Sequence, residues 1–425
     1  MKKFLLLSTA LLIVIQQSNS QGLFESSIAG SDSLSETPVS FHGFTRSALY
    51  SGTNSQDELF LQSIYSQFAL SAQVKTGKYG EAYAEVRYRR GEEFSQSVNE
   101  VNLREAYISA FLGPVTLRAG KQVYSWGVGS FLNPSDQSSP LNPTFRSPYS
   151  DDLRLGRWAL QGQLQITNQS YFEATWFPYH TPSVMITEPF EFPESLQLLD
   201  PAENELKLEN SGYRLRYDVR SSFLDLALSF YHGYRNNPLL LRDTVLLNLG
   251  NMNIDRIDFQ KAAYVINNAG LNLTIPVGSY IFRTEAAYLD FPDNEDNPQL
   301  PFNELSYIAE IEQSGNNVTL IGGYHGKYIF NFEKTGNTNL FLSGEVPNVS
   351  DIFPPGTVPD LNQLNSYIDN QVEGFNRLYN YQNESVYHAA YLNITFSLFY
   401  NQLEFDLPGM YNFTAEEFTF MPSIT

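Results

Sequence analysis

The feature that most constrains this chain is a strict alternation of apolar and polar side chains. Within residues 158–166, Trp158, Leu160, Leu164 and Ile166 share one parity, and glutamines occupy positions 161, 163 and 165. Successive side chains of a β-strand point to opposite faces, so this pattern predicts a strand with one apolar and one polar face. Three glutamines on one face suit a wet interior better than a dry core.

The alternation recurs along the chain, and in most repeats the polar face carries charges. A slip of one residue would turn every charge toward the apolar side, so the pattern also specifies the strand register. The clearest repeats are residues 82–89, 115–119, 213–218, 224–230, 305–312 and 403–407.

The connections between these segments alternate between short and long. Short turns are expected at 76–80, 112–114, 168–170, 221–223, 276–279 and 314–317, and longer polar stretches at 124–156, 179–210, 232–260, 290–302 and 331–384. Outer-membrane barrels have short periplasmic turns and long external loops. We therefore predict an all-β protein, a transmembrane antiparallel β-barrel in residues 39–425. About sixteen strands are detectable, and sixteen to eighteen are expected. A soluble sandwich or propeller is the alternative, but it rarely needs such long loops on one side only.

The N-terminus predicts export. Lys2 and Lys3 precede an apolar run, Phe4–Ile15, that is too short to span a bilayer, and the small residues Ser18 and Ser20 suit a cleavage site. We expect residues 1–20 to be a signal peptide and residues 21–38 a flexible periplasmic lead-in. A retained anchor helix is the alternative. With the barrel pattern, export places the chain in a bacterial outer membrane, in contact with lipid.

Composition excludes several classes of function. The chain has no Cys, so disulfides and thiolate metal sites are impossible, and its formal net charge of −20 argues against nucleic acid as a partner. No metal-ligand cluster, phosphate loop or dinucleotide fingerprint is present, so we expect no cofactor and no enzyme activity. An outer-membrane phospholipase would need a Ser–His pair, but Ser385 and His388 would fall on opposite faces of one strand. A serine from a neighbouring strand stays open.

The polar faces of the predicted strands supply candidate pore-lining residues with both positive and negative charge. Opposed charges across a pore set a transverse field that orients polar solutes, whereas the plainer interpretation is ion pairs that only fill the lumen. The candidates are Arg87, Arg89, Arg118, Arg157, Arg214, Arg216, Arg283, Lys327, Glu85, Glu105, Asp225, Glu285, Glu310, Glu312 and Glu404.

The stretch 124–157 is the most distinctive loop. Its Asn-Pro pairs at 133–134 and 142–143 favour defined turns. Such a loop can fold into the barrel and narrow it, or pack outside it, and the sequence does not separate the two. The candidate constriction residues are Trp126, Asn133, Asp136, Arg146, Asp152 and Arg154.

Residues Leu103 to Asp136 resemble a poorly characterised family of outer-membrane barrels related to alginate-export-type porins. The matching features are the strands at 104–107 and 118–122 and the turns Trp126-Gly127 and Asn133-Pro134. The resemblance implies a monomeric transport barrel with further strands after residues 418–425. The mixed charges of the lumen differ from the strongly basic lumen expected of a polysaccharide exporter.

The last residues, Glu417–Thr425, read as a strand with Phe418, Phe420 and Ile424 on one face and no terminal aromatic residue. We expect either missing closing strands or an unusual final strand. The function predicted for the whole chain is a porin-like channel for passive diffusion of small polar or amphipathic solutes. The alternative is a surface-binding or adhesion barrel that acts through its long loops.

Overall fold

The computed structural model describes residues 39–53, 59–94, 96–147, 149–185, 195–199, 210–248, 253–292, 297–334, 352–353, 360–400 and 402–425. The predicted signal peptide and lead-in, residues 1–38, lie outside the described residues. No helix in the described part of the chain is long and apolar enough to cross a membrane.

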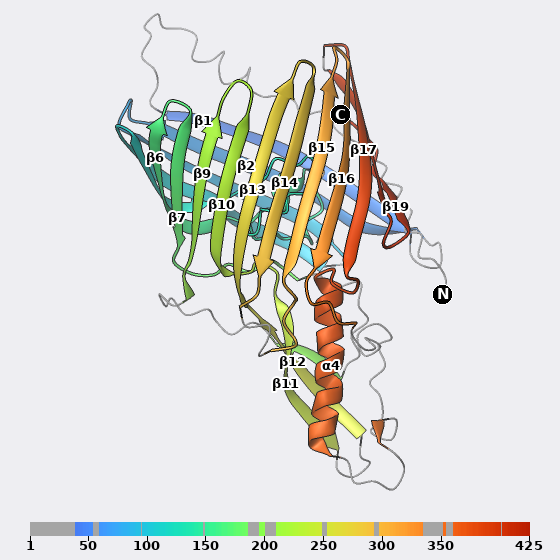
Figure 1. Cartoon of the computed structure of the whole chain (residues 1–425). Coiled ribbons are helices and arrows are strands. Elements are labelled where there is room, and N and C mark those ends of the chain that lie inside the picture. The colour runs from blue at the N-terminus through green and yellow to red at the C-terminus, as the bar shows by residue number, and fades with distance from the viewer. Residues whose placement is uncertain are drawn as a thin grey trace, which may run out of the picture.

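Most of the described residues form one large antiparallel sheet of seventeen strands (Figure 1). From β1 to β19, each strand pairs with the next one of the sheet along the chain. The strands are β1 (Val39–Thr53), β2 (Leu59–Lys75), β3 (Gly80–Glu93), β4 (Gln96–Leu112), β5 (Val115–Gln122), β6 (Arg157–Thr167), β7 (Ser170–Phe177), β9 (Gly212–Arg220), β10 (Asp225–Tyr234), β13 (Val265–Val277), β14 (Tyr280–Asp290), β15 (Glu304–Ser314), β16 (Val318–Ile329), β17 (Val386–Leu398), β18 (Leu403–Asn412), β19 (Glu417–Phe420) and β20 (Ser423–Ile424).

The last two strands, β19 and β20, both pair with β18 and together occupy one strand position. Residues Met421 and Pro422 separate them. The prediction of one unbroken strand over 417–425 is therefore wrong in this detail, because proline has no N–H to donate to the ladder. Counted by position, the sheet has the sixteen strands expected from the sequence.

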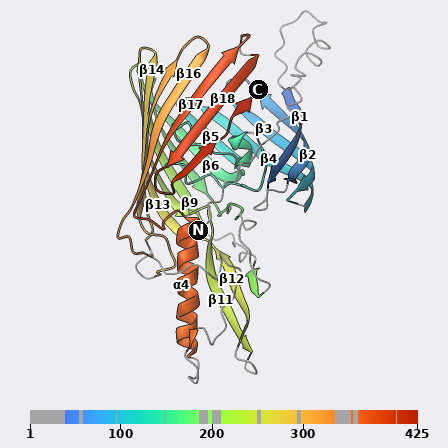
Figure 2. The same ribbon diagram turned by 90° about the vertical axis from the view of Figure 1, so that its right-hand side faces the viewer.

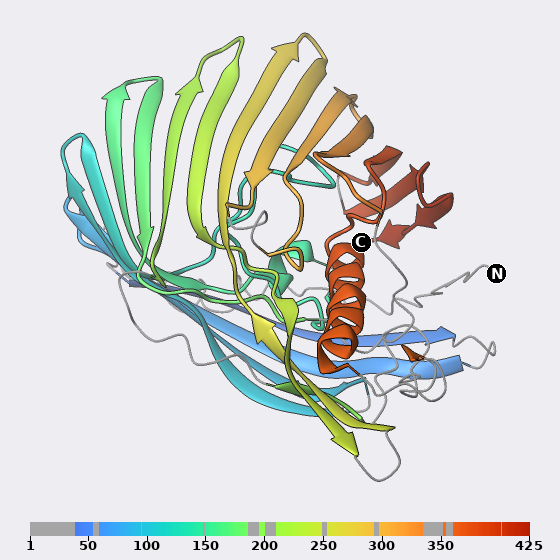
Figure 3. The same cartoon turned by 60° about the horizontal axis from the view of Figure 1, so that its bottom comes forward.

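The sheet curves into the wall of a barrel (Figure 3). Among the described residues β1 pairs only with β2, and β19 and β20 pair only with β18, so the wall is not closed between these edges (Figure 2). Strand content, antiparallel pairing and curvature confirm the predicted fold class.

The two faces of the sheet follow the predicted alternation. Trp158 and Leu160 of β6 are 45% and 48% exposed on the outer face, as are Leu228 of β10 and Ile311 of β15 at 48% and 41%. The side chains of the charged face point inward, and among them Arg214 is only 1% exposed. This arrangement suits lipid outside and a polar interior within.

All six predicted short turns lie at one end of the sheet, and the long connections lie at the other (Figure 1). Beyond that second end the structure has a small cap. The cap consists of a mixed three-stranded sheet and one helix: β8 (Leu196–Leu199), β11 (Leu239–Asn248), β12 (Asn253–Ala262) and α4 (Leu361–Tyr379). In this sheet β12 pairs antiparallel with β11 and parallel with β8.

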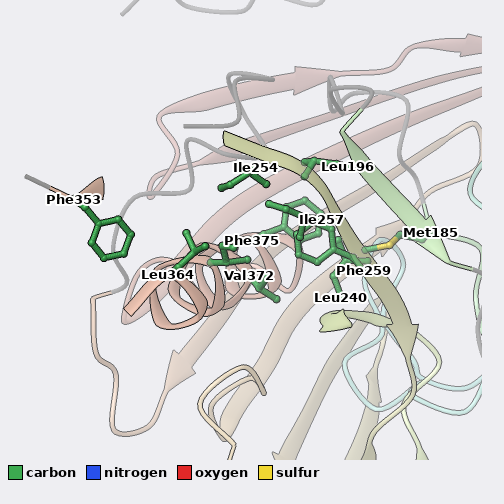
Figure 4. Close-up of a cluster of buried hydrophobic side chains, with 11 residues drawn as sticks. Met185, Leu196, Leu240, Ile254, Ile257, Phe259, Phe353, Leu364, Val372 and Phe375 are labelled. Atoms are coloured by element: carbon green, nitrogen blue, oxygen red, sulfur yellow. The ribbon is translucent and has the colours of Figure 1, made fainter. Parts of the chain in front are cut away.

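The cap has its own hydrophobic core (Figure 4). Leu364, Ile368, Val372 and Phe375 form one buried face of α4, at the spacing of an amphipathic helix, and pack near Phe259 of β12. The interpretation of 179–210, 232–260 and 331–384 as polar loops is therefore wrong for β8, β11, β12 and α4, which lie largely within these stretches. The helical periodicity in 361–379 was the signal that could have corrected it.

Candidate functional site

The chain between β5 and β6, residues 123–156, runs through the interior of the curved sheet (Figure 3). We call it the inner segment; position 148 is outside the described residues. Its contacts reach strands on all sides of the wall, as the following hydrogen bonds show. Of the two placements that the sequence left open, the structure has the inner one.

Local turns give the inner segment its shape. The Asn133 side-chain oxygen accepts a hydrogen bond from the Gly129 N–H at 3.0 Å, and the Asn133 carbonyl accepts one from the Asp136 N–H at 3.0 Å. Gly127 has φ +108°, and a Cβ there would lie 2.0 Å from the Asn133 Oδ1. Glycine therefore meets both requirements of this turn, positive φ and close approach.

Two carboxylates hold the inner segment on one side of the wall. Glu285 of β14 accepts hydrogen bonds from the N–H groups of Val128 at 2.9 Å and Ser135 at 2.6 Å, and from the Ser135 hydroxyl at 2.7 Å. Glu310 of β15 accepts from the Ser130 N–H at 2.8 Å and hydroxyl at 3.1 Å. Both glutamates are buried. These five hydrogen bonds connect two buried side chains of the wall to the segment, so Glu285 and Glu310 anchor it.

Two arginines, on β6 and β9, also hold the inner segment. Arg157 of β6 donates to the Ser138 carbonyl at 2.8 Å, and Arg214 of β9 donates to the Ser138 hydroxyl at 2.9 Å. The Arg214 guanidinium also lies 3.3 Å from the centre of the Trp126 ring, with Arg216 4.9 Å from that centre. Buried contacts between a guanidinium and an indole face are attractive, so Trp126 is a further anchor.

A third contact involves Asp152, near the end of the inner segment in the short 3-10 helix Ser150–Leu153. Its carboxylate accepts hydrogen bonds at 2.5 Å from Arg46 of β1, from Arg87 of β3 and from the Ser147 hydroxyl. Burial raises the pKa of Asp152, but the hydrogen bonds from Ser147, Arg87 and Arg46 outweigh it and hold the pKa at about 2. Asp152 is therefore ionised at neutral pH.

Two arginines of this cluster, Arg46 and Arg104, were not predicted from the sequence to line the lumen. Arg104 donates to Asp151 at 2.9 Å and lies 3.7 Å from the Asp152 carboxylate. The register of β3 and β4 shifts between Glu85 and Val86, so Arg104 sits at a β-bulge. A bulge redirects a side chain that simple alternation would place on the other face. No alternation in 42–48 marked Arg46 as inward.

The other candidate residues divide into paired and exposed groups. Arg118 pairs with Glu81 at 3.3 Å, Arg283 with Glu312 at 2.5 Å and Lys327 with Glu304 at 2.8 Å. Asp225 and Glu404 are exposed near the end with the short turns and lie apart from the inner segment. The remaining contacts are Arg89 with Glu93, Glu85 with Arg87, Glu105 with the Val123 N–H, Arg154 with Asp136, Arg216 with Asp218 and Arg146 with the ring of Phe94.

Part of the interior is apolar, which the sequence did not predict. Tyr124, Phe177, Tyr231, Ile266 and Leu289 belong to one buried cluster on the inner side of β6, β7, β10, β13 and β14. Phe177, Ile266 and Leu289 are fully buried. The inner segment thus packs tightly against this side of the wall, and polar cavity space lies on the side of β2 to β4.

Comparison with known proteins finds one matching family and a number of similar solved structures. The model of a family described as "Protein of unknown function (DUF1302)" matches residues 50–311. The chain has no detectable sequence similarity to a curated protein.

Three examples of the similar solved structures follow. They are the Salmonella typhi OmpF in complex with daunomycin (TM-score 0.44, 7% identity, 88% of this chain and 89% of that chain), the outer-membrane protein OmpT of Vibrio cholerae (0.45, 10%, 88% and 86%) and the outer-membrane channel DcaP of Acinetobacter baumannii (0.43, 7%, 91% and 94%).

Proposed function

The chain belongs to the family described as "Protein of unknown function (DUF1302)", and we propose that it is an outer-membrane channel, because its antiparallel sheet curves around the inner segment. In this role it passes small polar or amphipathic solutes by diffusion, without catalysis or energy input. The outer face is apolar over the strands, and the ends are marked by short and long connections, as a barrel that spans this membrane requires.

The observation that carries the proposal is the anchoring of the inner segment to opposite walls. Glu285 of β14 and Glu310 of β15 hold it on one side, and Arg46 of β1 and Arg87 of β3 hold it on the other. A segment fixed across a lumen narrows it, and a narrowed polar lumen can select the solutes that pass. The proposed constriction residues Trp126, Asn133, Asp136, Arg146, Asp152 and Arg154 all belong to this segment.

The test is single-channel recording of the refolded full chain in a planar bilayer, beside a variant in which residues 128–135 are replaced by three glycines. We expect stable open steps for the natural chain and larger steps for the variant, because a shorter segment leaves more of the lumen free. A chain that inserts but stays silent in both forms would contradict the channel proposal.

A second candidate function is binding at the cell surface through the cap. The favouring observation is that the cap has a core of its own, in which Leu240, Ile257 and Phe375 are buried. An ordered platform on the end with the long connections can present a fixed surface. Deletion of 361–379 that leaves conductance intact but abolishes a cell-surface interaction would favour this function.

A further inference from the structure

The interior contains a cavity of about 150 Å³ between the inner segment and the strands β3 and β4. β5 ends at Gln122, and its pairing with β4 extends only as far as Ala106. The preceding part of β4, residues 96–105, therefore lacks a strand partner on that side among the described residues. The cavity lies beside this unpaired part of β4. It is lined by Gln67, Arg87, Arg89, Glu100, Asn102, Arg104, Lys121, Phe145, Asp152, Arg154, Leu155, Gly156 and Thr181.

The lining is positively charged. Five cationic side chains and two carboxylates face the cavity. Several counter-charges stand behind the lining: Glu93 pairs with Arg89, Asp136 with Arg154 and Glu85 with Arg87. Arg104 likewise pairs with Asp151, so every arginine of the lining has a carboxylate partner, and Lys121 is the lining cation for which the described residues form no ion pair.

Lys121 differs from the arginines of the lining. Its ammonium donates to the Leu103 carbonyl at 2.7 Å. Leu103 belongs to the part of β4 that does not pair with β5. In the described part of the chain no carboxylate forms an ion pair with it. Lys121 lies opposite Trp158 in the β5–β6 register and so has the outer parity, and it borders the cavity beside the unpaired part of β4. An ammonium has three donors, so Lys121 can donate to an oxyanion at this edge of the cavity without losing an existing ion pair.

The rest of the lining is partly apolar, because Phe145, Leu155 and Gly156 lie beside the cations. A cavity of about 150 Å³ can hold a ligand the size of benzene, with six non-hydrogen atoms. The combination of cationic and apolar wall fits an organic carboxylate better than an inorganic anion, which would leave the apolar wall unused.

We propose that this cavity is a binding site for short organic carboxylates, with Lys121 and Arg104 facing the carboxylate and Phe145 and Leu155 facing its carbon chain. The inference deepens the proposed function, since it names the class of solute that the channel would select. The binding step itself does not depend on whether the channel conducts.

The first test is calorimetric titration of the detergent-solubilised full chain with butanoate, its neutral isostere butanamide, and inorganic phosphate. We expect saturable binding of butanoate, weaker binding of phosphate and none of butanamide. The variant Lys121→Gln should weaken butanoate binding roughly tenfold, the size expected for the loss of one hydrogen bond to a charged group.

Arg90→Gln is the matched control. Arg90 is an exposed residue of β3 that does not line this cavity, so its replacement removes one positive charge from the wall and leaves the cavity lining unchanged. Equal weakening in both variants, or binding of butanamide as tight as that of butanoate, would overturn the proposal.

Single-channel recording separates the two proposals. Saturable reduction of chloride current by butanoate, lost in Lys121→Gln and kept in Arg90→Gln, supports both. Open steps together with no calorimetric binding overturn the carboxylate site and leave the channel. Calorimetric binding to a chain that never conducts overturns the channel and leaves the site.

Discussion

At the residue scale, the side chains that hold the inner segment also contact one another. Tyr391 of β17 donates to Glu310 at 2.5 Å, and its ring lies over Gly323, where a Cβ would meet the ring at 2.3 Å. The same ring packs against Phe131 of the inner segment, with centroids 4.7 Å apart. Glycine at position 323 thus leaves room for a tyrosine that connects the wall to the segment.

Glu285→Gln should loosen the inner segment. Glutamine has one acceptor oxygen and a donor NH₂, so it cannot accept from both the Val128 and Ser135 N–H groups. We expect a loss of stability of about 1–3 kcal/mol, and more open-channel current noise. Thermal unfolding in detergent and bilayer recording measure these two effects.

Glu312→Gln is the control for that variant. Glu312 is also an inward carboxylate, but it pairs with Arg283 on the neighbouring strand. Its replacement should leave the current noise unchanged. Equal noise in the two variants would mean that Glu285 does not anchor the segment.

Asp152 predicts a particular dependence of stability on pH. Its folded pKa of about 2 lies below the ordinary value of 3.8, so ionised Asp152 stabilises the folded state. This contribution is fully present above about pH 4 and is lost as the pH falls toward 2. The difference in unfolding free energy between the natural chain and Asp152→Asn should therefore be constant from pH 5 to pH 8 and shrink below about pH 4. A difference that stays the same at pH 2.5 would contradict this role.

At the element scale, α4 depends on its burial in the cap. Asp360 caps its N-terminus by accepting from the Asn362 N–H at 2.9 Å, and Leu364, Val372 and Phe375 lie in the cap core. Its contact with the rest of the molecule also includes Asn376, whose side chain bonds both backbone groups of Leu240 in β11. The helix therefore joins the last long connection to the connection before β13.

Phe375→Ala should unfold the cap locally. Removal of this fully buried ring is expected to cost about 3–5 kcal/mol. Limited proteolysis should then cut within the cap, while the barrel strands stay protected. Leu361→Ala, at a position 59% exposed on the same helix, should leave the digestion pattern unchanged. Protection of the cap in Phe375→Ala would show that it is not an independently opening unit.

At the scale of the whole molecule, the two ends of the sheet differ, and this difference predicts orientation. The short turns should face the periplasm and the cap the outside. Since the chain has no Cys, single cysteines can be labelled without background. On intact cells an impermeant maleimide should label Asp243→Cys in the cap and not Ser222→Cys in a short turn, both of which are exposed positions. Labelling in the reverse order would invert the orientation.

The sequence by itself determined the barrel wall. Alternation placed Trp158 and Leu160 outside and Arg214 and Glu310 inside, because a strand has only two faces and lipid accepts only one kind of side chain. The positions of the short turns followed from the same periodicity. These features are local, so they can be read from neighbouring residues.

Only the tertiary structure decided which inward residues act together. Glu285 and Ser135 lie 150 positions apart, and Arg46 and Asp152 lie 106 apart, so nothing in their neighbourhoods marks them as partners. The inward path of residues 123–156 and the inward turn of Arg104 at its bulge likewise depend on register and on what lies across the lumen. The cap core, the anchoring of the segment and the carboxylate cavity are products of contacts between distant residues. Alternation alone records only which way each side chain faces.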